Sequence, residues 1–247
     1  MAIGRSANPT LRADTFAKFE GVKTDAAAMT IQGTVNKTFI MLIILLIPAS
    51  YTWKLFAQGV NTIPIIIGGS IVGLIIALIT VFKKTWSPVT APIYAVAEGA
   101  FLGSLSAFFE AMFPGIVIQA VALTFGTLLA LLLAYKSGLI KATENFKLGV
   151  VAATGGIFFI YFLTFIFRLF GFNMPYIHGS GTIGILFSLF VVIIAALNLV
   201  LDFDFIEQGT ENKAPKYMEW YAAFGLMVTL IWLYIEFLRL LSKLRSR

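Results

Sequence analysis

The sequence predicts an all-α polytopic membrane protein folded as a bundle of seven transmembrane helices. Of its 247 residues, 59% are hydrophobic and only 12% are charged, with a mean hydropathy of +0.92. A soluble domain carries about 25% charged residues. Seven apolar runs approach the roughly 20 residues that a helix needs to cross a bilayer. None of them alternates as a barrel strand does, and a helix pairs its own backbone groups in lipid.

The seven predicted spans are separated by short polar segments. The first contains Pro48, which predicts a kink, and the second ends at Lys83 and Lys84. A Phe-Pro-Gly turn at 113–115 separates the third span from the fourth. The predicted spans are 38–57, 62–82, 91–112, 115–135, 148–171, 181–203 and 219–241.

Residues 1–36 are polar and of mixed charge, and they predict a cytoplasmic tail before a transmembrane domain at 37–247. The first apolar run starts too late for a signal peptide. Lysine and arginine collect in cytoplasmic loops, and here they precede the first span and follow the second, fourth and sixth. We therefore expect a multi-pass protein of the cell (inner) membrane with its N-terminus in the cytoplasm. These bases are Arg5, Arg12, Lys18, Lys23, Lys37, Lys83, Lys84, Lys136, Lys141, Lys147, Lys213 and Lys216.

The bases that follow the last span disagree with this orientation. Either the seventh span is not a full crossing, or the combined bias of the other loops overrides its charges. The sequence leaves both explanations open. These bases are Arg239, Lys243, Arg245 and Arg247.

Several function classes are excluded by what the sequence lacks. It has no cysteine, so disulfides and thiolate chemistry are absent, and its one histidine, His178, does not suffice for a multi-histidine metal site. HExxH and GxGD motifs are missing, and the seventh span has no central lysine for a retinal Schiff base. The bases lie beside apolar spans, so they report orientation rather than nucleic-acid binding. We expect no enzymatic activity and no cofactor.

Glycines are frequent within the predicted spans. Two pairs, Gly69 with Gly73 and Gly99 with Gly103, have the GxxxG spacing that lets helix backbones approach closely. Tight bundle packing is the expected role of these residues. The other span glycines are Gly68, Gly155, Gly156, Gly181 and Gly184.

Five of the twelve acidic residues lie in or against the spans. A charge near the bilayer centre costs about 2.5–3.5 kcal/mol on insertion scales, so such residues normally face the bundle interior or a water-filled cavity. Glu98 lies seven residues into the third span with no base within a helical turn, and it is a candidate for an ion path or its gate. Glu110 lies near the outer end of the same span, where it reaches the interface.

Asp202 and Asp204 follow the sixth apolar run and lie about 200° apart around a helix, so they do not share a face. Asn198 lies one turn before Asp202 on its face. We expect Asp202 to point into a polar interior and Asp204 to mark the cytoplasmic edge. Negative charge at a helix C-terminus is unfavourable, which argues against both aspartates merely ending the helix in solvent.

The seventh span carries its own polar residues. Glu236 and Arg239 have the spacing of an ion pair on one helical face. Thr229 lies seven residues before Glu236 on almost the same face and continues a polar stripe. Asn198, Thr229, Glu236 and Arg239 are therefore predicted as supporting polar residues.

Three segments in this order resemble the Bax inhibitor 1-like family, in particular its branch of uncharacterised prokaryotic members. They are EGAFLG at 98–103, LDFDFI at 201–206 and the closing helix that ends in LRLL at 238–241. The resemblance covers about residues 38–244. It implies a pH-sensitive calcium leak in which two aspartates of the last two helices share a proton. Asp202 matches the first aspartate, whereas Thr229 stands where the second is expected.

The predicted function is a passive cation leak, with Ca²⁺ as the ion, because hard carboxylate oxygens suit Ca²⁺. Asp202, Glu98 and Asp204 are the predicted path or gate residues, and Asp202 and Glu98 are predicted as weak, transient Ca²⁺ ligands. Asp204, Glu98 or Glu236 replaces the missing aspartate in the dyad. The expected partners are the lipid bilayer, Ca²⁺ and protons, without nucleic acid; no protein partner is predicted. The alternative is a non-transporting membrane regulator or interaction protein whose carboxylates are structural.

Overall fold

A computed structural model describes residues 28–171 and 179–246, and within them seven helices are long and apolar enough to cross a membrane. The predicted seven-helix bundle is therefore confirmed. The tail up to residue 27, His178 and Arg247 lie outside the described residues. The elements are α1 (Ile31–Ala57), α2 (Ile63–Phe82), the 3₁₀ turn η3 (Lys84–Trp86), α3 (Ser87–Met112), α4 (Ile116–Lys136), α5 (Glu144–Leu169), α7 (Thr182–Glu211) and α8 (Met218–Arg245).

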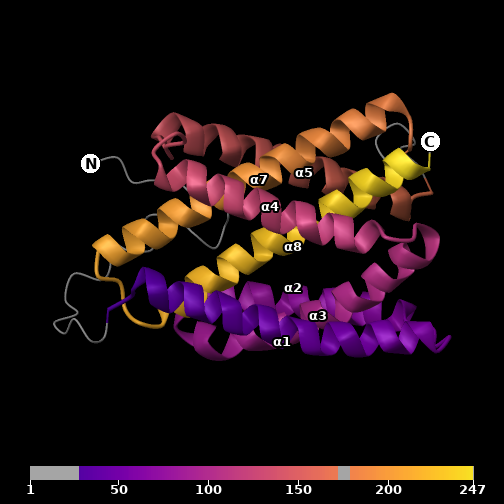
Figure 1. Cartoon of the computed structure of the whole chain (residues 1–247), viewed down its shortest axis with the longest axis horizontal. Helices are drawn as coiled ribbons and strands as arrows, with labels where there is room; N and C mark the ends of the chain where they lie inside the picture. The colour runs from indigo at the N-terminus through magenta and orange to yellow at the C-terminus, as the bar shows by residue number, and fades with distance from the viewer. Residues whose placement is uncertain (1–27, 172–178, 247) are drawn as a thin grey trace.

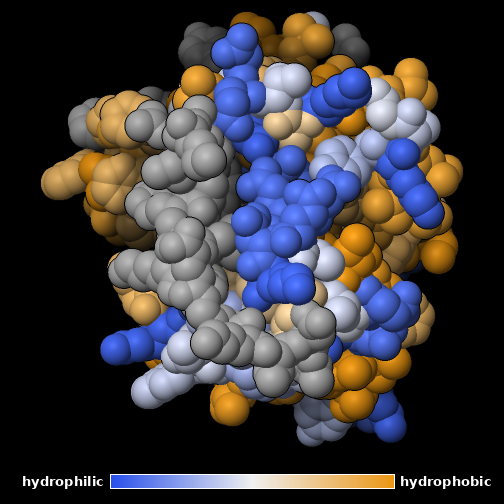
Figure 2. Space-filling view, turned by 90° about the vertical axis from the view of Figure 1, so that its left-hand side faces the viewer, coloured by the Kyte–Doolittle hydropathy of each residue, from blue (hydrophilic) through white to orange (hydrophobic). Residues whose placement is uncertain are grey.

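Helix α8 runs through the middle of the bundle (Figure 1). It contacts α1, α3, α4 and α7, and most of its residues are buried. On one side α3 packs against α1 and α2, and on the other α7 packs against α4 and α5. We call the end at which α1, α3, α5 and α8 begin the N-terminal end of the bundle. Figure 2 looks onto that end and shows hydrophilic side chains near its middle and hydrophobic ones around its edge.

Helices α1 and α7 extend furthest beyond the apolar runs that predict them. Helix α1 begins at Ile31, where the Thr30 hydroxyl accepts a hydrogen bond from the Gly33 amide as an N-cap. Helix α7 continues to Glu211, and the chain turns at Lys213, which has a φ of 49°. The predicted sixth span stops at the first charges, whereas the helix itself continues through a polar segment.

The turn between α3 and α4 has a clear local cause. Gly115 adopts a φ of 81°, a left-handed conformation that costs glycine little. The Glu110 carboxylate accepts hydrogen bonds from the amides of Gly115 at 2.5 Å and Val117 at 3.1 Å, so it caps the first turn of α4. Glu110 therefore has a structural role at the end of the bundle opposite the N-terminal end.

The two GxxxG pairs lie where helices cross closely, which confirms their predicted packing role. A side chain at Gly99 would overlap the Leu45 carbonyl and the Pro48 ring of α1, and one at Gly103 would overlap Ala49. Helix α1 continues through Pro48 to Ala57. Gly69 and Gly73 of α2 face α3 in the same way. The packing prediction is wrong for four other glycines, which face open space: Gly68, Gly155, Gly156 and Gly181.

Replacing Gly99 or Gly103 by alanine is expected to lower stability by about 1–3 kcal/mol each, because the new methyl group overlaps the backbone of α1. The matched control is Gly126→Ala on α4, where a side chain meets nothing within 4 Å. The measurement is the thermal unfolding midpoint of the purified protein in detergent. Equal midpoints for Gly103→Ala and Gly126→Ala would contradict the close α1–α3 crossing.

Candidate functional site

Asp202 is completely buried within α7. It lies nine residues before Glu211, the last residue of α7, which is about 13 Å along the helix at 1.5 Å per residue. Phe205 follows three residues later on the same face. The Phe205 ring packs against Tyr221 in the first turns of α8, with 6.3 Å between the centroids. Asp202 therefore lies in the protein interior, as predicted.

A continuous row of aromatic rings crosses the core from this point. Tyr221 packs against Phe224 with centroids 6.3 Å apart, and Phe224 meets Tyr94 of α3 edge-on at 4.9 Å. Tyr221 and Phe224 are fully buried and Tyr94 is nearly so. The Lys84 ammonium lies 5.6 Å from the Tyr221 ring centroid, in cation–π range. We call Phe205, Tyr221, Phe224 and Tyr94 the aromatic row.

Glu98 lies at the other end of the aromatic row. It is 8% exposed, and it lies one helical turn after Tyr94 on α3. Its carboxylate occupies space that Gly73 of α2 leaves open, because a side chain there would overlap it. Glu98 and Asp202 are thus both buried, but the aromatic row stands between them. Within the described residues, no three Asp, Glu or His side chains group closely enough to hold a metal ion.

The other predicted polar residues mostly face α5 rather than the aromatic row. Lys147, Thr154 and Tyr161 of α5 are spaced by seven residues and share one helical face. Each of these three side chains contacts another helix at a different position along α5. Lys147 Nζ lies 2.8 Å from Asp204 Oδ2, Asn198 Nδ2 donates to Thr154 Oγ1 at 2.9 Å, and the Tyr161 hydroxyl donates to Glu236 at 3.2 Å. We call these three contacts the α5 polar stripe.

Asp204 has a defined structural environment. Gln208 Nε2 donates to its Oδ2 at 2.6 Å, in addition to the contact with Lys147. The Asp204 side chain is 19% exposed, and it lies seven residues before the end of α7. It therefore lies within the helix and pairs with Lys147.

The predicted pair of Glu236 and Arg239 is confirmed, with Arg239 Nη1 2.6 Å from Glu236 Oε1. The same Arg239 nitrogen donates to the Tyr161 hydroxyl at 2.6 Å, so the pair fastens α8 to α5. Thr229 is buried and donates to the Gly225 carbonyl of its own helix at 3.3 Å.

Glu219, which the sequence analysis missed, is the most heavily bonded carboxylate in the described residues. It is fully buried in the first turn of α8, where negative charge is favourable. The amide and hydroxyl of Thr30 donate to it at 2.9 and 2.8 Å, Lys216 lies 2.8 Å away, and Lys37 of α1 forms a further ion pair. We call this cluster the α1–α8 lock. The sequence does contain a signal for this cluster, because Glu219 stands at the start of a predicted span and three residues after Lys216.

The bases at the end of α8 bind other helices. Lys243 is buried and donates to the Gly184 carbonyl at 3.0 Å and to Ser188 at 2.8 Å. Arg245 donates to the Pro114 carbonyl at 2.7 Å and to Gln119 at 3.0 Å. Because α8 is a 28-residue helix, it is long enough for a full crossing. Lys243 and Arg245 therefore hold α8 to neighbouring segments. This role gives a physical reason why these bases lie at the end of the bundle where the other loops carry few bases.

Seven apolar helices with buried polar contacts between them define a polytopic α-helical membrane protein. The chain belongs to the Bax inhibitor 1-like family, because the family model described as Bax inhibitor 1 like matches residues 8–246. A search of curated proteins returned no match.

The substitution Glu219→Gln is expected to lower stability by about 2 kcal/mol, because it removes the charge of a buried carboxylate that pairs with the partly exposed Lys37 and Lys216. Glu211→Gln is the control, since Glu211 is an exposed carboxylate at the end of α7. The measurement is the thermal unfolding midpoint in detergent. The lock would be unimportant for stability if both variants unfolded at the wild-type temperature.

Proposed function

We propose that this protein provides a passive, gated pathway for cations, with Ca²⁺ as the principal ion, and that it acts by transport rather than catalysis. The observation that carries this proposal is the complete burial of Asp202 deep within a membrane-spanning helix. A carboxylate at such a depth is costly, and residues of this kind often belong to ion or proton paths. Glu98, buried at the other end of the aromatic row, is the second acidic residue of the proposed path.

The chemistry of these residues suits Ca²⁺. Carboxylate oxygens are hard ligands that this ion prefers, and two separated carboxylates give successive weak sites rather than one tight site. Weak sites favour conduction, because an ion must leave as readily as it enters. No resident cofactor is needed for this function.

The aromatic row is the proposed gate. Tyr221 and Phe224 are fully buried and pack against each other, which supports a closed gate in this conformation. Opening requires α8 to shift relative to α3 and α7, and such small movements are a known route between two packed states. Protons compete with cations for the same carboxylates, and flux is therefore expected to depend on pH.

We place the N-terminal end of the bundle in the cytoplasm and the protein in the cell (inner) membrane. The bases Lys83, Lys84, Lys136 and Lys141 lie at or beyond helix termini at that end, and the positive-inside rule favours this orientation. The bases at the opposite end are engaged with neighbouring helices, as described above.

A second function is favoured by a different observation. Asp204, Glu219 and Glu236 all connect helices to one another. If Asp202 and Glu98 serve the same purpose, the protein is a non-transporting membrane regulator whose carboxylates hold the bundle together.

Ca²⁺ flux into dye-loaded proteoliposomes separates the two functions. Wild type, Asp202→Asn and Glu98→Gln are compared from mildly acidic to mildly alkaline pH, with Glu211→Gln as the control. All four proteins are first matched for folding and insertion. We expect Asp202→Asn to reduce flux about tenfold, or about 1.4 kcal/mol in barrier height, because an attractive charge is lost from the path.

A changed pH profile in Asp202→Asn, with Glu211→Gln unchanged, would support Asp202 as part of a proton-linked gate. If Asp202→Asn conducts with the same pH profile as wild type, Asp202 is not part of the gate. Wild-type flux no greater than that of empty liposomes would favour the regulator.

A further inference from the structure

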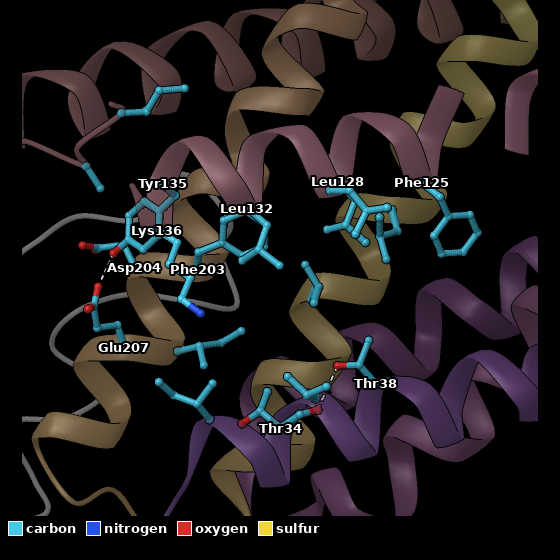
Figure 3. A pocket seen from close by; sticks show the side chains of 18 of the residues that line it. Thr34, Thr38, Phe125, Leu128, Leu132, Tyr135, Lys136, Phe203, Asp204 and Glu207 are labelled. Atoms are coloured by element: carbon cyan, nitrogen blue, oxygen red, sulfur yellow. Dashed lines mark hydrogen bonds between the residues drawn. The ribbon is translucent and has the colours of Figure 1, made fainter. Parts of the chain in front are cut away.

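A large apolar groove lies between α1 and α4, and residues of α7 and α8 form its base (Figure 3). Its volume is about 1020 Å³. Leu128 and Leu132 of α4 and Leu230 of α8 are among the side chains that line it. Helices α1 and α4 both pack against α8, and α8 is their principal connection. In a bilayer, such a groove is open to lipid rather than to water.

The length of the groove matches one leaflet of a membrane. On α1 it extends from Ile31 to Leu42, and on α4 from Lys136 to Phe125, a separation of eleven residues in each case. At 1.5 Å per residue this is about 16 Å. The hydrocarbon core of a bilayer is about 30 Å thick, so the groove is about as long as one leaflet is thick.

The mouth of the groove, at the N-terminal end of the bundle, carries available positive charge. Lys136 and Lys141 line it and are exposed, and neither forms an ion pair within the described residues. Two carboxylates line the groove at the same end. Asp204 pairs with Lys147, and Glu207 accepts a hydrogen bond from the Tyr135 hydroxyl. Figure 3 shows Tyr135, Lys136, Asp204 and Glu207 together at this end of the groove.

We propose that this groove binds one anionic glycerophospholipid of the adjacent leaflet. One acyl chain lies along the groove against α8, and the phosphate lies between Lys136 and Lys141. Each base near a membrane surface attracts anionic lipid, and the apolar lining favours the chain. The proposal does not depend on ion conduction.

The test is native mass spectrometry of the whole purified protein, titrated with lipids in detergent. The probes are phosphatidylglycerol, phosphatidylcholine with the same acyl chains, and glycerol 1-phosphate, which has the anionic group without a chain. The double variant Lys136→Ala/Lys141→Ala removes the mouth charges, and Leu132→Trp fills the groove at a side chain that is 40% exposed. Lys83→Ala is the matched control, an exposed lysine at the same end of the bundle that does not line the groove.

We expect tighter binding of phosphatidylglycerol than of phosphatidylcholine, and no comparable binding of glycerol 1-phosphate. The double lysine variant is expected to weaken phosphatidylglycerol binding on the order of tenfold. Leu132→Trp is expected to weaken it as well, whereas Lys83→Ala leaves it unchanged.

Three results would overturn the proposal. Equal affinity for both lipids would show that the mouth does not select an anionic headgroup. An equal loss in Lys83→Ala would indicate general surface electrostatics. Unchanged binding in Leu132→Trp, or equally tight binding of glycerol 1-phosphate, would show that no acyl chain occupies the groove.

Discussion

Hydrocarbon offers no hydrogen-bond partners, and this constraint decides how the polar side chains of the bundle are arranged. Every polar group that is removed from water must find its partner on another helix or on its own backbone. The α5 polar stripe is the clearest result, because its three contacts attach a helix whose other surfaces face outward. The α1–α8 lock follows the same logic at the N-terminal end of the bundle. Buried polar groups therefore specify which helices meet, whereas apolar packing supplies the close fit.

The close crossings around α3 make the interior sites possible. Gly99 and Gly103 let α1 approach α3, and Gly73 leaves space for the Glu98 carboxylate. The aromatic row then fills the region between Glu98 and Asp202. Small residues at the crossings and large rings in the core together produce a tight packing in which both acidic residues stay buried.

Helix α8 connects the two proposed sites. One face carries Tyr221 and Phe224 of the proposed gate, and another contributes Leu226 and Leu230 to the groove. Its first turn is held to α1 by Glu219, and its last turns are held to α5 and α7 by Arg239 and Lys243. Any shift of α8 that opens the core also changes the groove. A helix fastened at both ends has limited freedom, so such a shift is expected to be small.

The sequence by itself determined the seven helices, the family and the presence of costly acidic residues, because hydropathy and charge are local properties of the chain. It also predicted the pair of Glu236 and Arg239, which lie on one helical turn. Only the tertiary structure decided that Asp204 meets Lys147 and that Glu219 meets Thr30, 189 residues away. The physical reason is that lipid-facing and core-facing sides of these helices are equally apolar. The hydrophobic pattern therefore does not reveal how each helix is rotated, and helix rotation decides which polar groups meet.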